Sequence, residues 1–172
     1  MARHRRIDIS GEVPAVGATT KEPIPELDDV RTRRAGLKVA LSGLEIALAA
    51  PGGHRDAWVR GVRESLARVH EVWTRHIVET EAPGAFLDEL VSEAPRLATP
   101  ASRLRREHNR ILEAITAAEL KADAPPDDDA YDTWVDGMRT ECNALLVALV
   151  KHRQRGADLV YEAYDVDIGG GS

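Results

Sequence analysis

The segment from residue 133 to residue 164 constrains the fold of this chain most, because it carries one long helical stripe. Its apolar side chains recur every three or four residues, which is the spacing of one face of an α-helix. The stripe consists of Trp134, Met138, Cys142, Leu145, Leu149, Leu159 and Ala163. Two further positions on this face hold His152 and Gly156. The pattern predicts a helix that directs an imidazole toward a protein core.

Three other long stretches have the same periodicity, at residues 25–50, 55–80 and 99–121, and a short helix is predicted at residues 85–93. Thr99 and Pro100 are expected to form the cap and the first turn of the third long helix. Strand-forming residues are scarce, since aromatic residues make up only 4% of the chain. Four long helices with short connections pack as antiparallel neighbours. We therefore predict an all-α protein, an up-and-down antiparallel four-helix bundle.

The predicted bundle spans residues 27–165 and lies between two segments without helical periodicity. Residues 1–26 combine a basic start with a stretch rich in proline and glycine, and we interpret them as a disordered arm. Residues 166–172 end in three glycines and a serine, which indicates a flexible tail. The chain is thus expected to form one domain with loose ends.

Histidines stand on the inner faces of three of the long predicted helices, as His76, His108 and His152. In an antiparallel bundle the end of the second helix, the start of the third and the end of the fourth lie together. At about 1.5 Å per residue, the three histidines lie roughly 6–10, 12 and 18 Å from those helix ends. We therefore expect them to converge on one layer of the core, apart from the remaining histidines, which are His4, His54 and His70.

Three inward imidazoles have two interpretations. A metal ion can satisfy all three at once, as in metal sites built in bundle cores from facing helices. Alternatively, each histidine occupies a separate position at the edge of the core and bonds to a carboxylate or a backbone carbonyl.

The segments around these histidines resemble a known family. Residues 73–90 (WTRHIVETEAPGAFLDEL), 103–112 (RLRREHNRIL) and 146–164 (LVALVKHRQRGADLVYEAY) are similar to the second, third and fourth helices of hemerythrin-like domains, the HHE cation-binding family. The resemblance implies a four-helix bundle around a non-haem di-iron centre that binds oxygen or takes part in iron, oxygen or nitric-oxide sensing and storage. Its ligands are a histidine on the first helix, His-x-x-x-Glu on the second, a histidine on the third and His-x-x-x-Glu on the fourth.

Carried over to this sequence, the resemblance implies that His76, His108 and His152 are metal ligands. The two carboxylates of the pattern are replaced by Thr80 and Gly156, and Gly36 stands near the expected histidine of the first helix. Glu79, three residues after His76, is close enough on a helix to act as a substitute ligand, and Glu81 is a poorer candidate. The expected cofactor is therefore iron in a mononuclear or degenerate di-iron site, or no metal at all.

The remaining features restrict the function. A formal net charge of −6 disfavours a nucleic-acid partner, and no apolar run is long enough to predict a membrane span. Cys142 is the single cysteine, so it cannot form an intramolecular disulfide. Because it lies in the apolar stripe, we expect it to be a small core residue. No secretory segment is visible, which favours the cytoplasm. No phosphate loop or serine elbow is present, so an enzyme is not expected.

These observations favour a protein that binds a metal ion, and the resemblance to hemerythrin-like domains implies that this ion binds or senses O₂ or NO or has a redox-sensing role. One alternative is a metal-free helical interaction or regulatory module that binds a protein partner through its arginine-rich end or through its apolar and tyrosine-bearing faces. The arginines of that end are also expected to form a solvated lattice of interhelical ion pairs with neighbouring carboxylates. A second alternative is a haem-binding bundle with an axial histidine.

Overall fold

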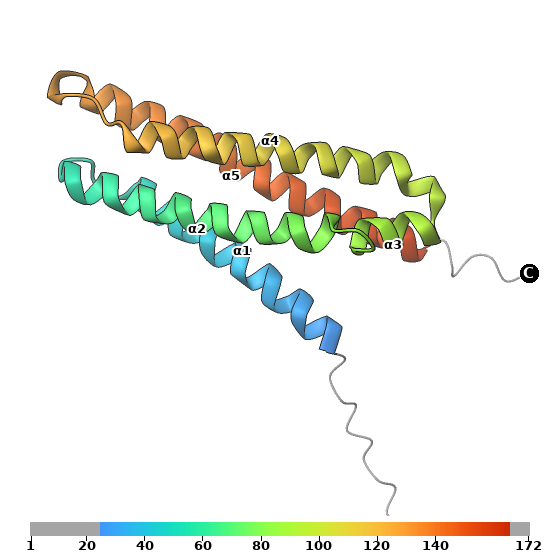
Figure 1. Ribbon diagram of the computed structural model, residues 1–172. Helices are drawn as coiled ribbons and strands as arrows, with labels where there is room; N and C mark the ends of the chain where they lie inside the picture. The colour runs from blue at the N-terminus through green and yellow to red at the C-terminus, as the bar shows by residue number, and fades with distance from the viewer. Residues whose placement is uncertain (1–24, 166–172) are drawn as a thin grey trace, which may run out of the picture.

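The computed structural model describes the backbone of residues 25–165 and the side chains of residues 35–163, and it is all-α over this part (Figure 1). The elements are α1 (Pro25–Ala49), α2 (Arg55–Glu81), α3 (Phe86–Glu93), the 3₁₀ turn η1 (Pro95–Leu97), α4 (Ala98–Asp123) and α5 (Asp128–Asp165). The helix α1 begins two residues before the predicted bundle boundary. The rest of the predicted arm and the whole predicted tail lie outside the described residues.

The long helices α1, α2, α4 and α5 form an antiparallel bundle. Each packs on the next along the chain, while α3 and η1 cover the end where α2 stops and α4 starts. The Arg139 guanidinium of α5 ties the opposite end to α1, donating to the carbonyl oxygens of Leu48 (3.0 Å) and Ala50 (3.1 Å). Away from this tie α1 diverges from α5, so α2 is its main neighbour (Figure 1).

The apolar stripes predicted from the sequence form the core. In α1 the buried residues include the whole predicted inner face, Leu37, Leu41, Leu44 and Leu48. In α5 the predicted stripe is buried from Met138 to Leu149 and again at Leu159. A second, smaller apolar cluster joins α3, η1 and the start of α4 to the last turns of α5. This second cluster closes the bundle over the end at which the three histidines lie.

The start of α4 differs from the sequence-based prediction. Thr99 is not a cap, because η1 leads directly into α4 and Ala98 already has a right-handed helical backbone conformation. Pro100 remains in the first turn, where the N–H group that a proline lacks would have had no partner within the helix. The limits of α1 and α2 and the last residues of α4 and α5 lie within two residues of the prediction, whereas α5 begins at Asp128, five residues before the predicted segment. None of the helices over residues 25–165 has both the length and the apolar character that a bilayer span requires.

Candidate metal centre

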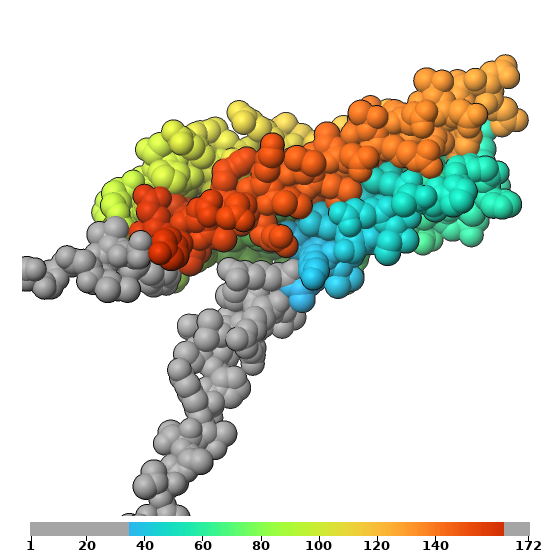
Figure 2. All heavy atoms as spheres, turned by 180° about the vertical axis from the view of Figure 1, so that it is seen from behind, coloured from blue at the N-terminus to red at the C-terminus, as the bar shows by residue number. Residues whose placement is uncertain are grey.

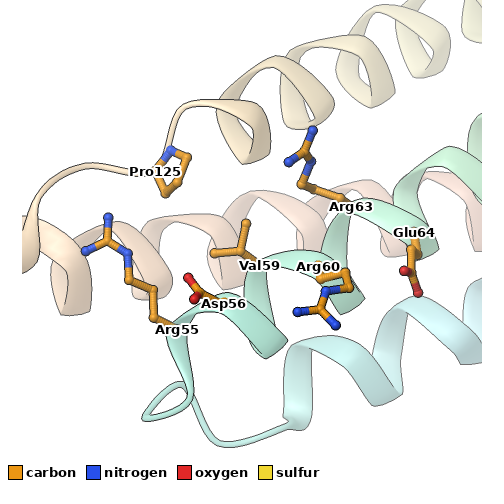
Figure 3. A pocket seen from close by; sticks show the side chains of 7 residues that line it. All are labelled: Arg55, Asp56, Val59, Arg60, Arg63, Glu64 and Pro125. Atoms are coloured by element: carbon orange, nitrogen blue, oxygen red, sulfur yellow. The ribbon is translucent and has the colours of Figure 1, made fainter.

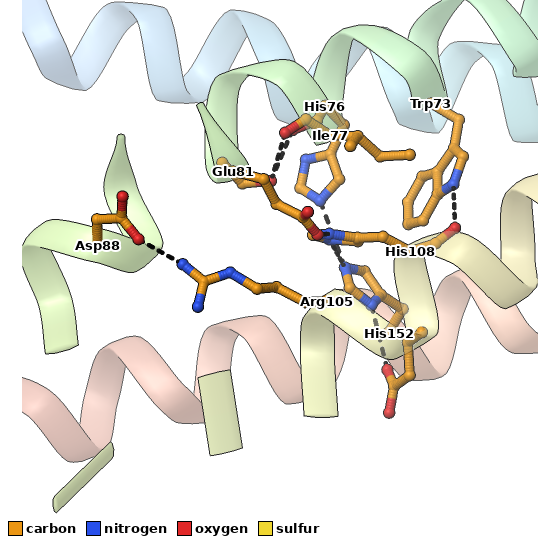
Figure 4. Close-up of polar contacts among 10 residues, drawn as sticks. Trp73, His76, Ile77, Glu81, Asp88, Arg105, His108 and His152 are labelled. Carbon is orange, nitrogen blue, oxygen red and sulfur yellow. Dashed lines mark hydrogen bonds and ion pairs between the residues drawn. The ribbon is translucent and has the colours of Figure 1, made fainter. Parts of the chain in front are cut away.

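Side chains from three helices meet in the core near the α3 end of the bundle (Figure 4). His76 of α2, His108 of α4 and His152 of α5 each place one ring nitrogen within 4.8 Å of the others. The Nε2 atom of His152 lies 3.3 Å from Nε2 of His76 and 3.1 Å from Nε2 of His108. His108 and His152 are buried, and His76 is partly buried. The predicted convergence of the three imidazoles is therefore confirmed.

The other histidines lie elsewhere. His54 is exposed at the start of α2, and the half-buried His70 contacts the Glu119 carboxylate through Nδ1 at 2.6 Å. His4 falls outside the described residues. Only the three inward histidines form a group with metal-ligand geometry among the residues that the structure describes.

Carboxylates hold the outer nitrogens of two of the clustered imidazoles. Nδ1 of His108 contacts Glu81 at the end of α2, and Nδ1 of His152 lies 3.1 Å from Glu107 of α4. A carboxylate accepts hydrogen bonds, so each Nδ1 carries the proton that it donates. In the neutral ring, Nε2 then presents a lone pair toward the centre of the cluster. Arg155 also holds the Glu107 carboxylate in place, because Nε of Arg155 lies 3.2 Å from the second carboxylate oxygen of Glu107.

The surroundings favour neutral imidazoles. Burial is the largest cause that lowers the pKa of His152, and the positive charges that His108, His76 and Arg155 can carry act in the same direction, so that this pKa is about 3. Burial also lowers the pKa of His108, although its hydrogen bond to Glu81 opposes that effect. At neutral pH the Nε2 atoms of these two rings therefore face each other as lone pairs 3.1 Å apart. Two facing acceptors repel each other, and a cation between them would remove the repulsion.

Trp73 forms one wall of the cluster. Its ring is fully buried and stacks on His76 with a centroid separation of 5.0 Å. It also meets His108 and His152 edge to face, at 5.4 and 5.0 Å. The indole Nε1 donates a hydrogen bond to the backbone oxygen of His108 at 3.2 Å. A single rigid side chain thus contacts all three imidazoles and fixes the spacing between α2 and α4.

The spacing of the Nε2 atoms fits one metal ion. A tetrahedral ion with bonds of about 2.0–2.1 Å separates its nitrogen ligands by about 3.3–3.4 Å, and an octahedral ion separates neighbouring ones by about 3.0 Å. The two separations that involve His152, 3.1 and 3.3 Å, fall in this range. Neutral imidazoles with their outer nitrogens bonded to carboxylates are the usual form of histidine ligands. Two of the three separations therefore match neighbouring ligands of one ion, and the ligand atoms of all three histidines lie within 4.8 Å of one another. His108 and His152 also have the tautomer that histidine ligands use.

A pair of bridged metal ions fits the described residues less well. Thr80, four residues after His76, turns its hydroxyl back to its own helix and donates to the His76 carbonyl oxygen at 2.8 Å. Gly156, four residues after His152, has no side chain, and a Cβ added there would meet nothing within 4 Å. The same is true of Gly36 on α1. The positions that carry additional ligands in the resembling family thus supply none here.

The carboxylates near the cluster differ in part from those expected. Glu79 is not in the group of close ligand atoms, so its role as a fourth ligand stays a prediction. Glu81, the poorer candidate from the sequence, contacts His108. Glu107 was not identified from the sequence at all. It directly precedes His108 in α4 but bonds to His152 in α5, so only the packing of the two helices reveals its role.

Ion pairs surround this end of the bundle, as expected from its mixture of arginines and carboxylates. Arg105 contacts Asp88 at 2.6 Å, which links α4 to α3 (Figure 4). Arg75 contacts Glu71 at 2.8 Å along α2. These groups are partly or largely exposed, so each pair contributes little to stability. Arg105–Asp88 is therefore an interhelical pair of the expected kind, whereas Arg75–Glu71 stays within one helix.

A surface hollow of about 540 Å³ lies at the opposite end of α2 (Figure 3). Its lining includes three arginines, of which Arg55 pairs with Asp128 and Arg63 with Asp123, both at 2.6 Å. Asp56 and Glu64 add negative charge to the same lining. Its charges largely cancel, so the hollow does not provide the concentrated positive charge that a phosphate site needs.

Comparison with known proteins adds no family assignment, because no protein-family model, no curated protein and no solved structure matches the chain.

Proposed function

We propose that this protein binds a single transition-metal ion through the Nε2 atoms of His76, His108 and His152. The observation that carries the proposal is the convergence of three imidazoles from three helices with Nε2 separations of 3.1 and 3.3 Å. Two carboxylates orient the rings so that lone pairs point inward. A core built only for stability would gain more from apolar side chains at these positions.

We propose iron as the first candidate ion, because the resemblance of residues 73–164 to hemerythrin-like domains implies it. Imidazole ligands suit zinc, copper and nickel as well as iron, so the donor set alone does not select one of them. Three protein ligands leave at least one position of the ion for a small exogenous ligand. O₂ or NO in that position would make the protein a sensor or carrier of the type that the resemblance implies.

The arrangement supports a single ion over haem. Axial ligands of a haem iron lie on opposite faces of the porphyrin ring and therefore about 4 Å or more apart. Here Nε2 of His152 is 3.1–3.3 Å from both of its neighbours, which corresponds to adjacent positions on one ion. Neither of these two pairs therefore fits the two axial positions of one haem iron.

The test is to measure metal content and metal affinity. The untagged protein is expressed in iron-supplemented medium and analysed for bound elements, and the metal-free form is titrated with Fe(II), Co(II) and Zn(II). We expect about one ion per chain and loss of tight binding when His76, His108 or His152 is replaced by alanine. The variants His54→Ala and His70→Ala serve as controls and should keep full binding. A folded protein that contains only trace metal and takes up none of the three ions would refute the proposal.

A further inference from the structure

The helix α1 exposes an apolar stripe on the side away from its buried leucines. Its members are the exposed residues Ala35, Val39, Ile46 and Ala49, and the partly buried Ser42 lies in the middle of the stripe at the same helical spacing. Val39 is 68% exposed and Ile46 is 72% exposed, the highest value among the exposed large hydrophobic residues. The part of α1 from residue 35 onward lies at the surface beside α5 in the view from behind (Figure 2). A helix on the surface of a bundle normally presents charged and polar side chains on this side.

Charge is sparse on the part of α1 that follows residue 34. Between residues 35 and 50 only Lys38 and Glu45 are charged, whereas 30% of the whole chain is charged. A helix that is apolar on all sides is normally buried on all sides. Yet α1 packs mainly on α2 and has little contact with α5. Its outer face therefore has the character of a surface that another protein covers.

Lys38 and Glu45 indicate which partner fits. They are seven residues apart, about two helical turns, and therefore lie on the same flank of the exposed stripe. Both are exposed, and neither forms an ion pair with the residues described here. When two identical helices pack antiparallel about a two-fold axis, the same flanks face each other. Lys38 of one copy then lies beside Glu45 of the other, and the reverse pair forms by symmetry.

We propose that the outer face of α1 binds a second copy of this chain as an antiparallel helix pair centred near Ser42 and Gly43. In this register Val39 of each copy packs beside Ile46 of the other. The crossing point carries two small residues, and a Cβ added at Gly43 would meet nothing within 4 Å, so the helix backbones can approach closely. The pairing buries the exposed apolar stripe, and it places each Lys38 beside a Glu45 of the other copy. It does not depend on metal binding.

Sedimentation of the full chain from micromolar to millimolar concentration tests this proposal. We expect a monomer–dimer equilibrium, and Ile46→Glu should raise the dissociation constant roughly tenfold or more, because it buries a charge in the interface. Leu120→Glu is the matched control, since Leu120 is 67% exposed on α4, away from the stripe. It should leave the dimer unchanged. A monomer at every concentration, or equal effects of the two variants, would overturn the proposal.

A charge exchange tests the antiparallel register and does not alter the apolar stripe. Lys38→Glu and Glu45→Lys should each weaken the dimer, because each places like charges opposite each other. The double variant restores opposite charges and should regain the affinity of the original chain. Circular dichroism confirms that each variant is folded. If the double variant is as weak as the single ones, the antiparallel pairing of α1 is wrong.

Discussion

The neutral state of His152 predicts how the metal-free protein responds to acid. The pKa of this imidazole is about 3 in the folded chain, against an ordinary value of 6.5. Between these values the unfolded chain binds the proton and the folded chain does not, so stability falls as the pH falls. Above pH 6.5 both states leave this imidazole mostly neutral, so its titration no longer lowers the free energy of unfolding. Lowering the pH from 7 to 5 should cost about 2 kcal/mol of unfolding free energy from this residue alone, at about 1.4 kcal/mol per pH unit below 6.5.

The assay is urea denaturation of the chelator-treated protein at pH 7 and pH 5. Replacing His152 by glutamine removes the titrating group, so the stability difference between the two pH values should shrink by about 2 kcal/mol. His54→Gln is the control and should keep the original difference, because His54 is exposed. Equal acid sensitivity of the original chain and His152→Gln would show that this imidazole is not held neutral by the fold.

Four further predictions concern single side chains. Glu107→Gln should weaken Zn(II) binding about 10- to 100-fold in a chelator competition assay, and Glu113→Gln should not, because Glu107 orients the His152 imidazole whereas Glu113 is exposed. Co(II) should quench tryptophan emission, and Trp73→Phe should remove this quenching, since Trp73 touches all three rings. Burial raises the pKa of Cys142 to about 11, so its alkylation at pH 8 should be at least about a hundredfold slower in the folded than in the urea-unfolded chain. Leu66→Ala should cost about 2–5 kcal/mol in urea denaturation, because Leu66 is fully buried, and a loss below about 1 kcal/mol would contradict the core assignment.

The fold followed from the sequence because helical periodicity is a local signal. The stripes of leucine in α1 and of mixed apolar residues in α5 repeat every three or four residues, and the core buries them. The start of α4 was missed at Thr99 because the 3₁₀ turn before it depends on packing. Leu97 of that turn is fully buried in the smaller apolar cluster, which holds the turn against α4. A cap rule that considers only neighbouring residues does not include this contact.

The candidate site followed from the sequence in part. Counting residues from the helix ends placed three histidines at one level, since an antiparallel bundle with short connections fixes which ends lie together. Glu107 and Trp73 gave no comparable signal. Trp73 fitted the apolar stripe of α2, and its contacts with the histidines depend on the spacing between helices. Glu107 bonds to a residue 45 positions away in the chain.

The sequence by itself determined which segments are helical, which faces are apolar and which three imidazoles point inward, because all of these depend on spacing along one helix. The tertiary structure decided how close the imidazoles come, which carboxylates orient them and which face of α1 stays uncovered. Those properties depend on how the helices rotate and approach each other, and that is set by the fit of side chains from all of them at once.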